Sequence, residues 1–164
     1  MRRFARLFAL AALATACAGA VAPEAGLFPS LDHARVTVTT ASGKHEFAVW
    51  IAADERSREQ GLMYVRELPP DRGMLFIFER PQPVAFWMKD TYLSLDLVFI
   101  DAAGRVLNIA ADAKPLSLTP IPSRGEAVAV LEVLAGTARK IGLEPGDRID
   151  LPTLRTTGSS RPLH

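Results

Sequence analysis

The sequence contains a single cysteine, Cys17, among its 164 residues. A disulfide bond within the chain is therefore excluded, and stability has to come from a hydrophobic core. Histidine is also scarce: His33 lies in a segment rich in Ala, Gly and Pro, His45 lies beside a turn, and His164 is the last residue. A zinc site and a Ser–His–Asp triad both need side chains of these types held by the core, so we expect neither.

An excess of charge of one sign is missing too. The chain has 19 Lys and Arg residues against 18 Asp and Glu residues, a formal net charge of +1. Three of the cations, Arg2, Arg3 and Arg6, lie in a leader that we expect to be removed. Nucleic-acid-binding domains carry a concentrated basic face, so the balanced charge excludes nucleic acid as an expected partner.

The first 20 residues have the pattern of a secretory signal peptide. The three arginines precede an apolar run at residues 7–16 (LFALAALATA), and small residues follow it. This run is too short for a transmembrane helix, which needs roughly 20 residues. We therefore predict a signal peptide over residues 1–20 and an exported protein.

Two fates of Cys17 stay open. The segment LATAC is similar to a lipoprotein signal, in which the leader ends before Cys17 and this cysteine is lipidated; Ala14 stands where such signals carry a bulky aliphatic residue. Alternatively, cleavage after Ala18 or Ala20 removes the cysteine. We expect the protein in the periplasm or lipid-anchored in the cell envelope, with membrane contact only through the leader or this lipid.

Short strand-forming segments separated by turn residues occupy the rest of the chain. Asp54 predicts the start of a short helix over residues 55–63, and Gly142 predicts the end of a helical turn over residues 137–141. Alternating or continuous apolar residues predict strands over residues 35–40, 45–51, 73–78, 84–88, 95–101, 105–110, 127–134 and 148–151. This pattern favours a mainly β fold, either a small barrel or a curled antiparallel or mixed sheet, with one short α-helix and a helical turn.

The length of the chain suits one domain. Residues 21–33 are rich in Ala, Gly and Pro and are expected to form a linker. Residues 34–151 are expected to form the single β-rich domain. Residues 152–164 show no apolar period and are expected to form a disordered tail.

Several sequence blocks occur together in the predicted domain. They are REQGLM at 58–63, GMLF at 73–76, FWMKDT at 86–91, LD at 95–96, LEV at 131–133, AGT at 135–137 and GD at 146–147. With these blocks, residues 35–151 resemble the domain-of-unknown-function family 192 (DUF192). Two residues depart from the family pattern, since Asp90 and Ser94 stand where the family usually has Asn and Pro. The resemblance implies a compact, mainly β domain that is often exported, but it supplies no established activity.

A binding site is predicted around the polar turn that follows the aromatic strand at residues 84–88. Aromatic side chains can form the wall of a pocket while polar groups at its rim orient a ligand. The residues concerned are Arg58, Trp87, Lys89, Asp90 and Thr91, together with the proline-rich loop 115–124. We therefore expect a non-enzymatic module that binds a small ligand or a partner protein of the cell envelope.

Two carboxylates in apolar strands suggest an alternative. A buried carboxylate is costly unless it is paired or hydrogen-bonded, so Asp96 and Glu132 each need a partner. A structural role satisfies this requirement. A hydrolase that uses both groups for acid–base chemistry would satisfy it as well, and would require the two carboxyls to lie within roughly 10 Å in one cleft.

Three methionines suggest a further alternative. If residues 73–78 and 84–88 form a hairpin about Pro81, Met74 pairs with Met88, and Met63 can pack on the same face. Three thioethers could bind Cu(I) in an exported protein. Methionine also fills gaps in hydrophobic cores, so core packing remains the competing interpretation. We predict no other cofactor.

Overall fold

The computed structural model of the protein describes residues 28–152. The predicted signal peptide, Cys17 and the predicted tail beyond Pro152 lie outside the described residues. Phe28 is buried and packs edge-to-face on Trp50, with 5.3 Å between the ring centroids. Phe28, which falls in the predicted linker, therefore packs against the domain. Neither helix within residues 28–152 is long and apolar enough to cross a membrane.

The domain begins with the predicted hairpin. β1 (His33–Thr40) and β2 (Gly43–Ala52) pair antiparallel, from His33 opposite Trp50 to Thr40 opposite Gly43. Val36 and Val38 alternate with polar residues along β1 and are fully buried, as expected for a strand with one face on the core. Gly43 closes the turn with a φ of 128°, which favours glycine.

A helical crossover joins β2 to the next strand. α1 (Glu55–Gln60) begins at Asp54, whose carboxylate accepts from the Ser57 backbone N–H at 2.9 Å, while the Ser57 hydroxyl accepts from the Asp54 N–H. The Ser57 backbone N–H, and the Ser57 hydroxyl that donates to the same carboxylate at 2.7 Å, lower the pKa of Asp54. The helix ends three residues before the predicted position because Gly61 leaves helical geometry with a φ of 48°.

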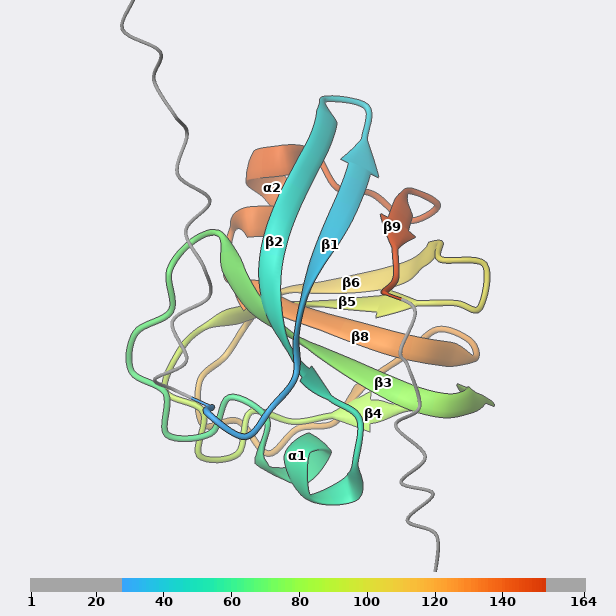
Figure 1. The fold of residues 1–164 in the computed structure, drawn as a ribbon. Coiled ribbons are helices and arrows are strands. Elements are labelled where there is room, and N and C mark those ends of the chain that lie inside the picture. The colour runs from blue at the N-terminus through green and yellow to red at the C-terminus, as the bar shows by residue number, and fades with distance from the viewer. Residues whose placement is uncertain (1–27, 153–164) are drawn as a thin grey trace, which may run out of the picture.

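The sheet has seven strands in the order β6–β5–β8–β3–β2–β1–β9. The remaining members are β3 (Arg72–Gln82), β5 (Leu95–Ile100), β6 (Val106–Ala113), β8 (Ala127–Leu134) and β9 (Arg148–Asp150). β2 and β3 run parallel and the other neighbours antiparallel. The predicted mainly β fold with a curled mixed sheet is therefore confirmed (Figure 1).

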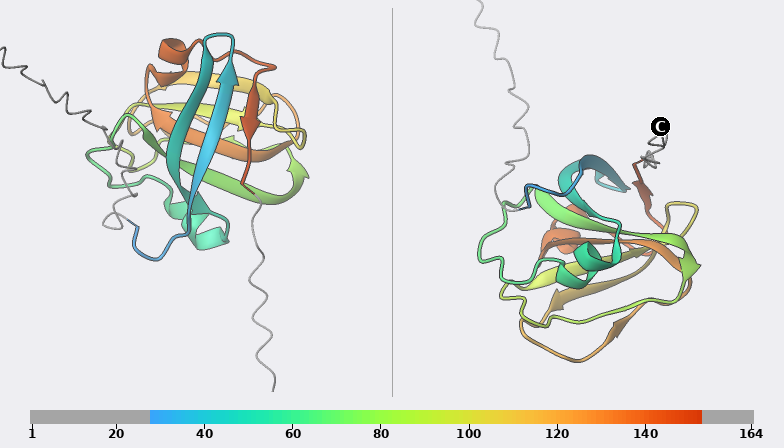
Figure 2. Two further views of the ribbon diagram at one scale, coloured as in Figure 1. Left: turned by 45° about the horizontal axis from the view of Figure 1, so that its top comes forward. Right: turned by 60° about the horizontal axis from the view of Figure 1, so that its bottom comes forward.

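The two edges of the sheet approach each other at one end. Arg105, just before β6, bridges to Arg148 in β9, and the Ile149 N–H donates to the Gly104 carbonyl at 2.8 Å. The sheet thus curls into an incomplete barrel, with β1, β2 and β9 crossing over the other strands (Figure 2). The helical turn α2 (Thr137–Ile141) ends at Gly142 as predicted.

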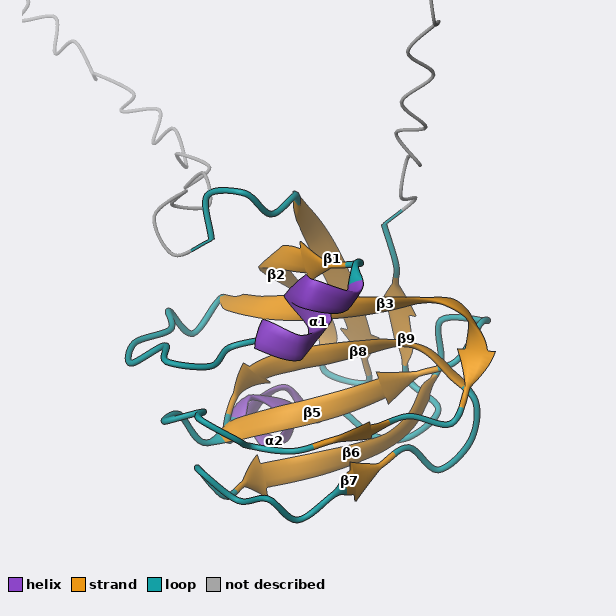
Figure 3. Cartoon of the chain, turned by 90° about the horizontal axis from the view of Figure 1, so that it is seen from below, coloured by secondary structure: helices purple, strands orange, loops and turns teal. Residues whose placement is uncertain are grey.

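The two faces of the central strands bury separate hydrophobic clusters. The first cluster includes Val98, Leu131 and Ile149. The second includes Met74, Phe76 and Leu97 and also contains side chains from the segments after α1 and before β5. α1 and the short strands β4 (Ala85–Phe86) and β7 (Ile121–Pro122) lie on one side of the sheet (Figure 3). The candidate site forms on this side.

The predicted hairpin between residues 73–78 and 84–88 is wrong. Residues 73–76 of β3 are hydrogen-bonded to β2 on one side and to β8 on the other, so this part of β3 has no free edge for β4. β4 instead pairs with β7 in a separate two-stranded sheet, and Pro122 belongs to that pairing. A period of two residues predicts a strand and its inward face, but it does not identify the partner strand.

Candidate functional site

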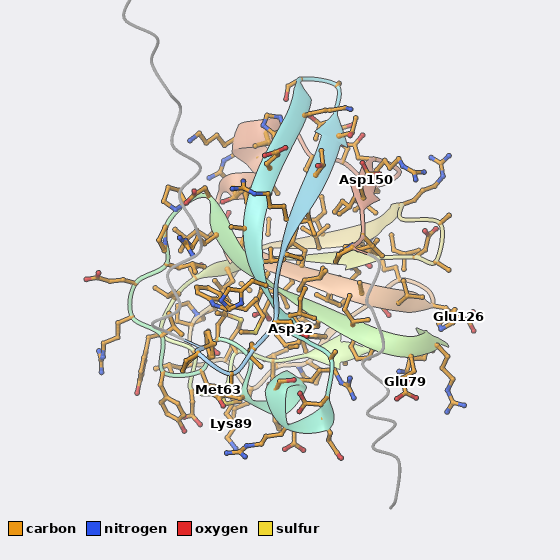
Figure 4. All side chains as sticks on the ribbon, viewed as in Figure 1. Asp32, Met63, Glu79, Lys89, Glu126 and Asp150 are labelled. Carbon is orange, nitrogen blue, oxygen red and sulfur yellow. The ribbon has the colours of Figure 1, made fainter. Side chains whose placement is uncertain are left out.

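A pocket of about 1070 Å³ lies between α1 and the segment that contains β4. Its walls come from α1, the turn after it, the second half of β3, and residues 84–91, and one residue of β8 reaches it. The lining includes Arg58, Met63, Trp87, Lys89, Thr91 and Glu132. Met63 and Lys89, labelled in Figure 4, lie on the side of the molecule where α1 is found.

Aromatic rings form the apolar part of this pocket. The rings of Phe76 and Phe86 meet edge-to-face with 4.9 Å between centroids, and Phe78 and Trp87 also line the space. Trp87 is 52% exposed, so it stands at the opening, whereas Phe76 is buried. Such a pocket offers apolar contact area to a small molecule.

Arg58 fastens α1 to the sheet. Its guanidinium donates to the Ala53 carbonyl and, at 3.1 Å, to the Ile77 carbonyl of β3. The guanidinium carbon also lies 5.6 Å from the centroid of the Phe78 ring. Arg58 was predicted as a binding residue; it does line the pocket, and it also holds one wall in place.

Glu132 is the buried acid of the site. It lies in the middle of β8, opposite Met74 of β3 and Leu97 of β5, and is 5% exposed. Within residues 28–152 no hydrogen bond or ion pair involves its carboxyl group. Burial raises the pKa of Glu132 to about 8, because an apolar environment disfavours the charged form.

Asp96, the other predicted acid, lies on the opposite face of the sheet. Leu97 is paired with Glu132 and Asp96 with Val133. Because side chains alternate along a strand, Asp96 and Glu132 point away from each other. The carboxylate of Asp96 accepts from the backbone N–H groups of Asp112 at 2.9 Å and Ala138 at 2.8 Å. The predicted hydrolase cleft containing both acids is therefore wrong, and Asp96 has a structural role.

The polar turn contributes only some of its predicted residues to the pocket. Lys89 and Thr91 line it, and the Lys89 ammonium lies 5.7 Å from the centroid of the Trp87 ring. Asp90 is outside the lining and accepts a hydrogen bond from the Tyr64 hydroxyl at 3.2 Å. Loop 115–124 is also outside the lining, but it supports the turn through bonds such as Met88 N–H to the Ser117 carbonyl at 2.9 Å.

Two of the three methionines lie in the hydrophobic core, and the third lines the pocket. Met74 and Met88 have no exposed surface and belong to the second hydrophobic cluster. Met63 is partly exposed and lines the pocket. Met74 and Met88 thus fill the core. Across residues 28–152, no group of three His, Cys, Asp or Glu side chains is placed to hold a metal ion.

Exposed apolar side chains gather on the loops beside the pocket. In the part of the chain that the structure describes, the large exposed ones are Tyr64, Trp87, Tyr92, Leu116 and Leu118. Their loops are joined by backbone hydrogen bonds from Tyr64 to Asp90 at 2.9 Å and from Leu116 to Thr91 at 3.1 Å. This surface could not be predicted from the sequence, because nothing in the alternation of residues places these three loops together.

The aromatic wall was predicted from Phe86 and Trp87, but Phe76, Phe78 and the acids Glu55 and Glu59 of the lining were not predicted. A signal was present, since the blocks at residues 58–63, 73–76 and 86–91 each contribute to the lining. Their separation in the sequence gave no information that they meet around one cavity.

Comparisons with known proteins agree with this fold. The model of the family DUF192, described as an uncharacterized ACR, matches residues 36–151. A crystal structure of a proposed transcription regulator from Sinorhizobium meliloti 1021 is 47% identical, with a TM-score of 0.72, covering 74% of this chain and 95% of that one. A protein of unknown function from Novosphingobium aromaticivorans DSM 12444 is 39% identical, with a TM-score of 0.76, covering 80% of this chain and 94% of that one. A search of curated proteins finds no match.

Proposed function

The chain belongs to the DUF192 family, and because the description of that family names no activity, we propose a function from the geometry of the site. The protein binds a small molecule in the pocket between α1 and β4, as a non-enzymatic module of the cell envelope. The envelope location rests on the signal-peptide pattern of residues 1–20.

One observation carries this proposal. The buried carboxyl of Glu132 reaches a pocket of about 1070 Å³ and has no hydrogen-bond partner within residues 28–152. Polar groups inside proteins are almost always hydrogen-bonded, either to protein or to water. Because the Glu132 carboxyl opens onto the pocket, a polar group of a ligand can supply its partner. A pocket with apolar walls and a few polar groups, one with a shifted pKa, is a usual feature of binding sites.

A second candidate function is binding of a partner protein. The exposed apolar residues Tyr64, Trp87, Tyr92, Leu116 and Leu118 favour it, because exposed apolar patches often mark interaction surfaces. The Sinorhizobium protein is described as a proposed transcription regulator, but this description alone gives no reason to expect that the present chain binds nucleic acid. Nearly equal numbers of acidic and basic residues give no electrostatic reason to expect one.

Ligand binding can be tested by screening small-molecule fragments against the ¹⁵N-labelled domain by NMR. We expect hits to shift the indole N–H of Trp87 and the backbone amides of residues 58–64 and 84–91. Replacing Trp87 by Ala should weaken such hits by roughly tenfold, about 1.4 kcal/mol. The matched control is Leu118→Ala, which removes an exposed apolar side chain outside the pocket lining. The proposal fails if hits are absent from the pocket or are equally sensitive to both substitutions.

A further inference from the structure

The positively charged side chains around the pocket do not neutralise Glu132. Arg56, Arg58 and Lys89 line the same space, yet none forms an ion pair with Glu132 in the described part of the chain. Arg58 is bonded to two backbone carbonyls, and Lys89 lies against the Trp87 ring. The site therefore contains a buried acid whose positive partner is not supplied by these side chains.

The two positions directly opposite Glu132 in the sheet carry apolar side chains. Met74 and Leu97 are its direct neighbours on the two flanking strands. Phe76, paired with Val130, is a diagonal neighbour on the same face and lies against Phe86. Between residues 28 and 152, no arginine or lysine lies over the ring of Phe76 or Phe86. Aromatic rings attract cations to their faces, so these rings favour a positive ligand group beside the acid.

We propose, on the basis of the binding function above, that the ligand carries a primary ammonium group that pairs with Glu132. The apolar body of the ligand contacts Phe76, Phe86 and Trp87. A primary ammonium has three N–H donors and no acceptor, which matches a carboxylate with both oxygens unbonded. A buried pair of opposite charges is strongly coupled in an environment of low dielectric constant.

Binding has a defined proton balance. In the free protein at neutral pH the Glu132 carboxyl largely keeps its proton, since its pKa is about 8. When the ammonium binds, the carboxyl loses this proton to solvent, and the ion pair replaces the neutral acid. The amine keeps all of its own protons. Each pH unit below the pKa therefore weakens amine binding by about tenfold, and the dependence disappears above it.

Other charged groups also face the pocket and have to be considered together with Glu132. α1 contributes Glu55, Arg56, Arg58 and Glu59, the turn after it contributes Tyr64, and the segment after β4 contributes Lys89. Arg72 of β3 is diagonal to Glu132 on the same face of the sheet, and its guanidinium carbon lies 6.0 Å from the centroid of the Trp50 ring. Glu126→Gln is the matched control, because it removes an exposed acid that is outside the lining and leaves Glu132 intact.

Calorimetry and NMR titrations with three probes of similar shape test the proposal. The probes are phenethylamine (cationic), 2-phenylethanol (neutral) and phenylacetate (anionic), each titrated between pH 6 and pH 8.5. We expect phenethylamine to bind most tightly, with an affinity that rises as the pH approaches 8 and with release of a proton at pH 7. Glu132→Gln should weaken amine binding at least tenfold and remove its pH dependence, while Glu126→Gln should change it little.

The possible outcomes distinguish failure of the ammonium assignment from failure of the proposed binding function. If the alcohol or the carboxylate shifts the Trp87 and Phe86 resonances and the amine binds no better, the ammonium assignment is overturned and the pocket remains a binding site. Equal amine affinity in Glu132→Gln overturns the assignment in the same way. If none of the three probes shifts a pocket resonance at millimolar concentration, both proposals are rejected. Thermal unfolding of Glu132→Gln establishes that the variant is folded.

Discussion

Asp96 and Glu132 lie on adjacent strands and are offset by one position in register, so their side chains point to opposite faces of the sheet. This relationship gives two buried acids different roles. Asp96 is bonded to two backbone N–H groups and belongs to the first face. Glu132 belongs to the second face, where it reaches the pocket without a partner in the described part of the chain.

Replacing Asp96 by Ala should destabilise the protein strongly. The change leaves the N–H groups of Asp112 and Ala138 without their acceptor, and a hydrogen bond to a charged group is worth roughly 1.5–3 kcal/mol. We expect a loss of about 3 kcal/mol in urea unfolding. Asp101→Ala is a matched control, because Asp101 also accepts from two backbone N–H groups, but in an exposed turn. A similar loss in both variants would contradict the structural assignment of Asp96.

Glu132 should make stability fall as the pH rises from about 4.5 to 8. Below pH 4.5 the carboxyl is protonated in both the folded and the unfolded chain. Between these values the unfolded chain loses the proton while the folded protein keeps it, because the folded-state pKa is about 8. Above pH 8 both states are ionised and the slope from this group vanishes. The free energy of unfolding should therefore decrease by roughly 1.4 kcal/mol per pH unit in this window.

Glu132→Gln provides the comparison. The variant cannot ionise at this position, so its advantage in stability over the natural protein should grow between pH 5 and pH 8. Glu126→Gln is the control, since Glu126 is exposed and lies at the far edge of the molecule from Lys89 (Figure 4). Urea unfolding at several pH values measures the difference. A constant difference across this range would show that Glu132 does not carry a raised pKa.

Much of the fold could be predicted from the sequence, because its signals are local. Alternation identified β1 and β2, Asp54 located the start of α1, and Gly142 located the end of α2. The pairing of strands, in contrast, is not determined by local signals in the sequence. β3 pairs with β2 and β8 rather than with β4, and this choice depends on the packing of the whole sheet.

The candidate site could be predicted only in part for the same reason. Trp87, Lys89 and Thr91 lie close together in the sequence and were recognised as one group. Glu132 lies far along the chain and reaches the pocket only because β8 is next to β3. The register that separates Glu132 from Asp96 likewise requires the pairing of β5 with β8.

Arg58 should control the attachment of α1 to the sheet. Arg58→Ala removes donors to the Ala53 and Ile77 carbonyls and the contact with the Phe78 ring. We expect a loss of about 1–2 kcal/mol in stability and faster amide hydrogen exchange in α1. Arg56→Ala is the matched control, because Arg56 is an exposed residue of α1 that also lines the pocket. Equal exchange rates in the two variants would show that Arg58 does not attach α1 to the sheet.

Gly73 is required by the close approach of β3 to β8. A Cβ atom added at this position would lie 2.3 Å from the backbone carbonyl oxygen of Glu132 and 3.0 Å from the side chain of Val133. Backbone cannot move away from such a contact without separating the two strands, so Gly73→Ala should lower the free energy of unfolding by at least roughly 2–3 kcal/mol.

Because the displaced atoms belong to Glu132 itself, Gly73→Ala should also disturb the pocket. Ala111→Val adds more atoms at an exposed position of β6 and should leave both stability and the Trp87 indole resonance nearly unchanged. Thermal unfolding and the NMR spectrum of the two variants provide the comparison. A stable Gly73→Ala protein with an unchanged Trp87 resonance would mean that β3 and β8 are not held as closely as the structure describes. The glycine of the GMLF block would then need an explanation other than strand packing.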